Sequence, residues 1–144
     1  MPFVDKKESS TNYTKQVKIE AEVEVKMYKS FKDMPIWINA MEIAVNIFTI
    51  TDTLPHKEDY GFTSQIRRSA LSISANIAEA FGRNHTADKI NFYYFARGSI
   101  TETQSHIEYG KKVGYLKENI ANVIDTKLIE IYNDINKIIV SLKK

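Results

Sequence analysis

Apolar residues recur every three or four positions in four long stretches of this chain. Such spacing places them along one side of an α-helix, so each stretch predicts an amphipathic helix. The predicted helices span about residues 33–53, 62–81, 86–113 and 119–142. The second carries its apolar stripe on Ile66, Ala70, Ile73, Ile77 and Phe81, and the fourth steps through Ile124, Leu128, Ile131, Ile135, Ile138 and Leu142.

Residues that typically start and stop helices lie between these stretches. Asp33 is expected to cap the first helix, with Pro35 in its first turn, and Thr86 to cap the third. Gly82 and Gly114 are expected to end the second and third helices. Because the connections are short, neighbouring helices should run antiparallel. The expected fold is all-α, an up-down-up-down antiparallel four-helix bundle over residues 31–144.

Residues 1–30 show a different pattern and are predicted to form an N-terminal arm outside the bundle. Between Val17 and Val25 apolar residues alternate with Lys and Glu, a period of two that favours a strand. A single strand without a hairpin partner is marginally stable. The arm is therefore either a strand that pairs with another chain, or a partly helical or disordered tail.

The second predicted helix is rich in Ser and Ala, which lets neighbouring backbones approach closely. Small and apolar side chains stand nearly all round it, so it should be the most buried helix of the bundle. In a bundle this small, part of that cover is expected to come from another subunit. Self-association is therefore predicted.

Composition narrows the class of protein. The chain has 144 residues, 43% of them apolar and 26% charged, which is typical of one globular domain. No apolar run reaches the roughly 20 residues that a bilayer requires, so no membrane association is expected. The absence of cysteine excludes disulfides and thiolate metal sites, and no secretory signal pattern opens the chain. A cytoplasmic protein is the simplest expectation.

Four charged residues of the second and third predicted helices, Arg67, Arg68, Glu79 and Glu102, could form an acid–base cluster. Half-buried charges of opposite sign more often neutralise one another, so we predict a structural network of ion pairs. Asn76 is expected to bond across the helix interface or to fix the helix register. The chain also lacks a Glu-x-x-His pair, a Ser-His-Asp order and a phosphate-binding glycine loop. No enzyme activity, metal or cofactor is expected.

Charge is the remaining functional signal. The net charge is only +2, but between residues 61 and 116 basic residues outnumber acidic ones. Symmetric copies of such a surface would form a positive rim able to bind phosphates, and Tyr93, Tyr94 and Tyr109 could stack on bases. We therefore expect binding of RNA or DNA, with a protein-interaction adaptor as the alternative. The candidate phosphate contacts are Arg83, Lys89, Arg97, Lys111 and Lys112.

Several of these motifs resemble the 23S ribosomal RNA intervening sequence protein family. The resemblance implies a four-helix bundle that assembles into a ring-like homopentamer, with no known catalytic activity. It also implies, from relatives that accompany diversity-generating retroelements, a basic barrel that binds nucleic acid and a reverse transcriptase. Ala80 departs from the family pattern, which has glycine there. The matching segments are Trp37 to Glu42, Ile66 to Ala70, Ser72 to Ile73, Asn76 to Glu79, Phe92, Ala96 to Ser99, Glu102 and Gly114 to Leu116.

Overall fold

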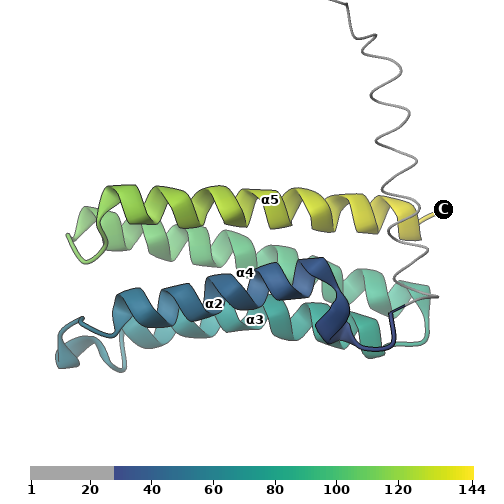
Figure 1. The fold of residues 1–144 in the computed structure, drawn as a ribbon, viewed down its shortest axis with the longest axis horizontal. Coiled ribbons are helices and arrows are strands. Elements are labelled where there is room, and N and C mark those ends of the chain that lie inside the picture. The colour runs from purple at the N-terminus through teal and green to yellow at the C-terminus, as the bar shows by residue number, and fades with distance from the viewer. Residues whose placement is uncertain (1–27) are drawn as a thin grey trace, which may run out of the picture.

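A computed structural model describes residues 28–144, and this part of the chain folds into four long helices (Figure 1). Each helix begins and ends within two residues of its predicted bounds, so the four predicted helices are confirmed. The predicted strand-like or disordered arm covers residues 1–30, and residues 1–27 of it lie outside the described residues. The elements in chain order are the 3-10 turn η1 (Phe31–Asp33), α2 (Pro35–Thr51), the 3-10 turn η2 (His56–Glu58), α3 (Phe62–Gly82), α4 (Thr86–Lys112) and α5 (Glu118–Leu142).

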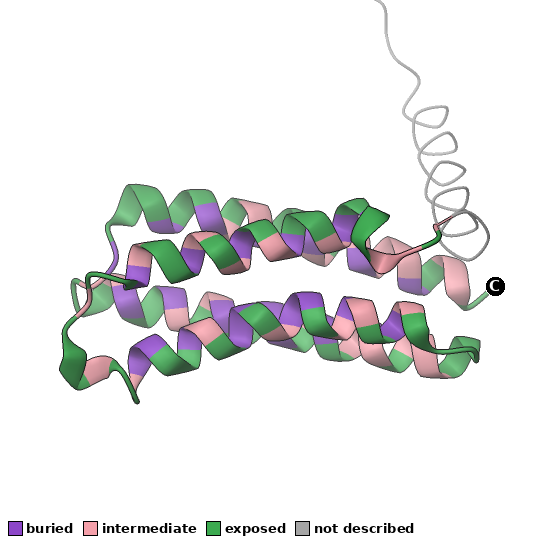
Figure 2. Cartoon of the chain, turned by 60° about the horizontal axis from the view of Figure 1, so that its bottom comes forward, coloured by how far each residue is buried: buried purple, intermediate pink, exposed green. Residues whose placement is uncertain are grey.

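The four helices form an up-down-up-down bundle in which each helix packs against two others. α3 lies between α2 and α4, and α5 closes the bundle by packing against both α4 and α2. Figure 2 shows the buried residues on the sides of the helices that face the interior. The predicted stripe of α3 is fully buried at Ile66, Ala70, Ile73 and Ile77. With nine of its 21 residues buried, α3 has the largest buried share of the four helices, as predicted.

The predicted N-terminal caps of α2 and α4 are each wrong by one position. Met34, which precedes Pro35, is extended at φ −73° and ψ 122°, and α2 begins only after it. A residue before proline is pushed into the extended region, so Asp33 cannot be the cap. Likewise His85 is the extended residue before α4, and Thr86 is the first residue of the helix.

Only one of the two predicted glycine terminators adopts the left-handed conformation. Gly114 has a φ of +80°, and Tyr115 N donates a hydrogen bond to Gly110 O at 2.9 Å, which closes α4 in a Schellman motif. α3 does end at Gly82, as predicted, but Gly82 does not adopt the left-handed conformation. Instead, Lys89 Nζ on α4 donates to the carbonyl oxygens of Ala80 (3.0 Å) and Phe81 (3.2 Å). These carbonyl groups in the last turn of α3 have no partner within the helix, so Lys89 caps it.

Glu58 joins three segments at the other end of the bundle. Its Oε2 accepts a hydrogen bond from Phe62 N at 3.2 Å, which places a negative charge at the start of α3. Its Oε1 accepts from the Tyr115 hydroxyl at 3.0 Å. Burial raises the pKa of Tyr115, and the hydrogen bond to the Glu58 carboxylate raises it further. Glu58 thus ties η2 and α3 to the turn between α4 and α5.

Candidate nucleic-acid interface

The α3–α4 contact is lined by small hydroxyl side chains that bond to one another. Ser72 Oγ lies 2.9 Å from Ser99 Oγ, and Thr103 Oγ1 lies 2.9 Å from Ser69 Oγ and 2.8 Å from Ser99 O. Asn76 Nδ2 donates to Ser72 O at 2.8 Å, within its own helix. The prediction that Asn76 bonds across the interface is therefore wrong, because Ser72 rather than Asn76 makes the hydrogen bond to α4. These hydroxyls therefore satisfy one another within the α3–α4 contact.

The predicted ion-pair network between two arginines and two glutamates is wrong. In the described residues, no ion pair joins Arg67 or Arg68 to Glu79 or Glu102. Arg67 and Glu79 stand twelve residues apart, about 18 Å along one helix, which is too far for a contact.

Each of these four side chains instead finds a nearer partner. Arg67 turns toward α2, where its Nε donates to Thr51 Oγ1 at 2.9 Å and its guanidinium lies 4.2 Å from the centre of the Phe48 ring. Arg68 donates to Gln65 at 3.2 Å, and Glu79 accepts from Arg83 at 2.7 Å. Glu102 lies 3.5 Å from His106 Nε2, an ion pair only when the imidazole is protonated. All four side chains therefore make contacts within their own helix or with an adjacent helix.

The five candidate phosphate contacts do not gather on one surface. Arg83 and Lys89 lie at the turn between α3 and α4, whereas Lys111 and Lys112 lie at the far end of α4. The 22 residues from Lys89 to Lys111 correspond to about 33 Å along the helix. Arg97 lies between these two groups.

Most of the five also have partners within the chain. Arg83 packs over the Phe92 ring at 4.6 Å besides its contact with Glu79. Arg97 donates to Asn136 Oδ1 at 2.9 Å and lies 4.8 Å from the Tyr94 ring centre. Lys111 donates to Glu108 at 3.1 Å. Lys89 is half-buried where it caps the end of α3. Of the five residues, Arg83 and Lys112 are exposed.

The three tyrosines proposed to stack on bases differ in accessibility. Tyr93 is fully buried, so its proposed stacking role is wrong. Tyr94 is half-buried beneath Arg97 and the Lys143 ammonium, which lies 5.5 Å from its ring centre. Tyr109 is 52% exposed and packs against the Phe62 ring at 5.5 Å. Of the two that are not buried, only Tyr94 lies in the half of the bundle that carries the excess of basic residues, described next.

Positive charge is concentrated at one end of the bundle. The half that contains the C-terminus and the α3–α4 turn, residues 28–43, 73–99 and 131–144, has eight Lys and Arg against five Asp and Glu. The other described half has seven against eight. We call the exposed cations at the first end the basic end; they come from three separate parts of the chain that meet there (Figure 1). They are Lys29, Lys32, Arg83, Lys143 and Lys144.

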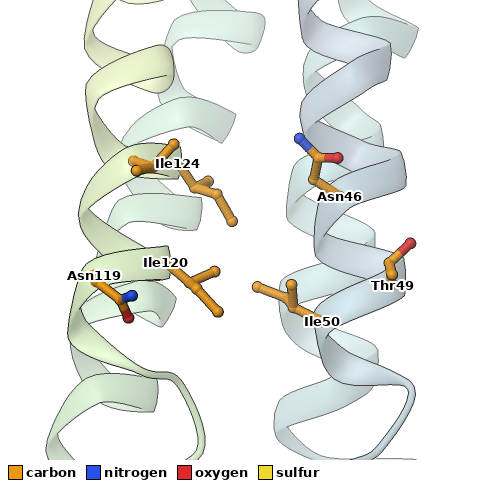
Figure 3. Close-up of a pocket in the computed structure, with 7 residues that line it drawn as sticks. Asn46, Thr49, Ile50, Asn119, Ile120 and Ile124 are labelled. Carbon is orange, nitrogen blue, oxygen red and sulfur yellow. The ribbon is translucent and has the colours of Figure 1, made fainter.

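A groove lies between α2 and α5, toward the C-terminal end of α2 (Figure 3). Its volume is about 410 Å³, and no ionisable side chain lines it. It therefore offers no general acid, base or charged ligand. Within residues 28–144, no group of three His, Asp or Glu side chains could hold a metal ion, and no helix is long and apolar enough to cross a membrane. The groove is lined by Asn46, Thr49, Ile50, Asn119, Ile120, Val123 and Ile124.

A family model for the 23S rRNA-intervening sequence protein matches residues 32–137, most of the chain. The chain belongs to this family. One solved relative is a protein of unknown function from the S23 ribosomal protein family of Bacteroides thetaiotaomicron VPI-5482. It is 28% identical with a TM-score of 0.68, and the match covers 73% of this chain and 95% of that one. Among curated proteins, none matches the chain.

The basic end lies partly outside the segment that defines the 23S rRNA-intervening sequence protein family. Lys29, Lys143 and Lys144 fall before residue 32 or after residue 137. Sequence reasoning missed these lysines because they belong to segments far apart along the chain. The available signal was their position at the outer ends of the first and last predicted helices, which an up-down-up-down bundle brings to the same end.

Proposed function

We propose that this member of the 23S rRNA-intervening sequence protein family is a non-enzymatic, self-associating bundle that binds nucleic acid through its basic end. The assembly is the homopentamer that the family resemblance implies. The observation that carries the proposal is the segregation of charge along the bundle axis, with exposed Lys and Arg gathered where the α3–α4 turn meets both ends of the described chain.

Phosphates are the ligands that such an end would attract. Lysine and arginine side chains in water bind nucleic-acid phosphates by releasing condensed counterions, with little dependence on base sequence. Lys32, Lys143 and Lys144 are exposed in the described chain and can approach a backbone without breaking an internal ion pair. A symmetric ring would place one such end from every subunit on the same side, which multiplies the local potential.

Salt dependence separates this proposal from an incidental contact. We would titrate a fluorescent single-stranded RNA with the full chain and follow anisotropy between about 50 and 200 mM salt. The basic-end variant carries Lys32→Gln, Lys143→Gln and Lys144→Gln. Its matched control removes three exposed charges at the opposite end, by Lys57→Gln, Lys112→Gln and Lys117→Gln.

The wild-type chain should bind at low salt and lose affinity steeply as salt increases. Removing three phosphate contacts per subunit at the basic end should lower the slope of log affinity against log salt by about two, whereas the control variant should keep the wild-type slope. An absence of binding at micromolar protein and low salt would refute the proposal. Equal losses in the two variants would refute the assignment to the basic end.

A protein-interaction adaptor is the second candidate, favoured by large apolar side chains exposed on α2 such as Phe48 and Val45, each 55% exposed. A reverse transcriptase is one partner that the family resemblance suggests. Pull-down from a nuclease-treated lysate should then still recover a protein partner, and anisotropy should show no RNA complex.

A further inference from the structure

Cationic and aromatic side chains alternate along the contact between α4 and α5, in the half of the bundle that carries the basic end. Arg97 Cζ lies 4.8 Å from the centre of the Tyr94 ring and 5.8 Å from that of the Tyr132 ring. Lys143, which follows α5, also lies over the Tyr94 ring. Arg97 donates a hydrogen bond to Asn136, which fixes its guanidinium between the two helices. Positive charge is thus held against aromatic rings rather than against carboxylates.

The adjoining side of α4 carries an open aromatic ring. Phe95 is 58% exposed and packs against Phe92 at a centroid distance of 5.6 Å, with the two rings at 80° to each other. In this edge-to-face arrangement Phe92 covers at most one face of the Phe95 ring. Arg83 Cζ lies 4.6 Å from the centre of the Phe92 ring, so a cation stands beside the aromatic pair. Unpaired bases stack on such uncovered rings in proteins that bind single strands.

Gly98 leaves the surface open between these two groups of side chains. Residues three and four apart are neighbours on a helix, so Gly98 adjoins both Tyr94 and Phe95. A Cβ at Gly98 would meet nothing within 4 Å, so no contact in the described chain requires a glycine there. Glycine is unfavourable in the middle of a helix and is typical of places where a ligand approaches the backbone closely. We call Tyr94, Phe95, Arg97 and Gly98 the α4 platform.

The charge around the α4 platform suits a nucleic-acid strand. Residues 89–101 include Lys89 and Arg97 but no Asp or Glu, so no carboxylate of this stretch would repel a phosphate. The platform is also continuous with the basic end, because Lys143 belongs to that end and contacts the Tyr94 ring. Phosphates of a bound strand can therefore reach the basic end while its bases lie on α4.

A duplex and a single strand would use this surface differently. The faces of the bases are stacked inside a duplex, so a protein reaches only its phosphates, sugars and groove edges. The bases of a single strand are free to stack on aromatic side chains and on arginine guanidinium planes. The α4 platform offers both kinds of surface beside the exposed lysines of the basic end.

We propose that the α4 platform is a stacking site for unpaired bases, and that the ligand of this protein is single-stranded rather than double-stranded nucleic acid. This inference rests on the nucleic-acid binding in the proposed function and names the form of nucleic acid that it selects. Each stacked base should strengthen binding by about tenfold, in addition to the phosphate contacts at the basic end.

Two RNA probes and one substitution test the stacking. The full chain would be titrated against a fluorescent single-stranded RNA and against the same strand annealed to its complement, between about 50 and 200 mM salt. Phe95→Leu removes the aromatic ring but keeps an apolar side chain. Its matched control is Tyr109→Leu at the other end of α4, where the ring is 52% exposed.

The wild-type chain should bind the single strand more tightly than the duplex. Phe95→Leu should weaken binding of the single strand by about tenfold and leave binding of the duplex unchanged. It should also keep the wild-type slope of log affinity against log salt, because it removes no phosphate contact. Tyr109→Leu should bind both probes as the wild-type chain does.

A second pair of variants fills the platform instead of removing a ring. Gly98→Leu adds a side chain where the bases would lie, and the fold should be retained because leucine favours a helix and a Cβ there meets no neighbour. The control Ser105→Leu adds the same side chain at an exposed position about two turns later on the same side of α4. Gly98→Leu should weaken single-strand binding by about tenfold, whereas Ser105→Leu should not. Circular dichroism would verify the helices of each variant, and light scattering its mass.

The outcomes separate this inference from the proposed function. If the wild-type chain binds neither probe at low salt, nucleic-acid binding itself fails. If it binds both probes equally well, or if Phe95→Leu or Gly98→Leu binds the single strand as tightly as the wild-type chain, phosphate binding stands and only the present inference is overturned. If either variant changes the mass of the assembly, the α4 platform is a contact between protein chains, and the inference is likewise overturned.

Discussion

Two glycines on α4 should respond in opposite directions to the same substitution. A Cβ built on Gly110 would lie 2.7 Å from Leu116 Cδ1 and 2.8 Å from Phe62 Cζ, whereas a Cβ on Gly98 meets nothing within 4 Å. The Phe62 ring is held between the rings of Tyr109 and Tyr115, with centroid distances of 5.5 and 5.8 Å, so it cannot move freely. Gly110→Ala must therefore displace packed side chains.

The magnitudes follow from two competing terms. Alanine is favoured over glycine inside a helix by about 1 kcal/mol, which applies to both sites. Overpacking at Gly110 costs about 1 to 3 kcal/mol, so Gly110→Ala should lose about 1 kcal/mol net. Gly98→Ala meets no such penalty and should gain about 1 kcal/mol. The two variants should thus differ by about 2 kcal/mol, or about 6 °C in Tm for a domain of this size.

Urea unfolding followed by circular dichroism would measure both variants against the wild-type chain. Protein concentration must be the same in all three samples, because association changes apparent stability. If Gly110→Ala is as stable as the wild-type chain or more stable, the close approach of Leu116 and Phe62 to α4 is refuted. If Gly98→Ala is destabilised, the outer side of α4 at that position is covered rather than open.

Two further substitutions test other contacts. Thr103→Val keeps the shape of the side chain but removes the hydroxyl that bonds within the α3–α4 contact, so it should cost about 1 kcal/mol in the free energy of unfolding. Thr101→Val on the exposed side of α4 should change that energy by less than about 0.5 kcal/mol, and equal effects at the two positions would contradict the hydroxyl contact. The raised pKa of Tyr115 favours the neutral side chain in the folded chain. Its contribution to the free energy of unfolding is therefore complete below the ordinary pKa of a tyrosine. That contribution is lost as the pH rises above this ordinary pKa toward the pKa in the folded chain. Tyr115→Phe should therefore lose less Tm than the wild-type chain between about pH 9 and 11, and parallel curves would contradict the contact with Glu58.

Helix existence and the inward face of each helix were predictable because both depend on local spacing. The stripe from Ile66 to Ile77 is buried as its three-and-four rhythm requires, and the left-handed Gly114 lies where a terminator was expected. Short turns between long helices then left the antiparallel bundle as the natural arrangement.

Side-chain partners were not predictable in the same way. Arg67 pairs with α2 rather than with a glutamate, and Lys89 binds the carbonyl end of α3 rather than standing free for a phosphate. Pairing depends on the rotation of each helix about its own axis and on its register against its neighbours. Both are set by packing of the whole bundle.

The amino-acid sequence alone determined the all-α class, the four helices and the family, because hydrophobic periodicity and short motifs are properties of contiguous residues. Only the tertiary structure decided that Lys32, Arg83 and Lys143 share one end, and that Lys143 lies over the Tyr94 ring of another helix. The physical reason is that charge density and surface exposure arise when segments distant along the chain come together in space, and no local pattern records that meeting.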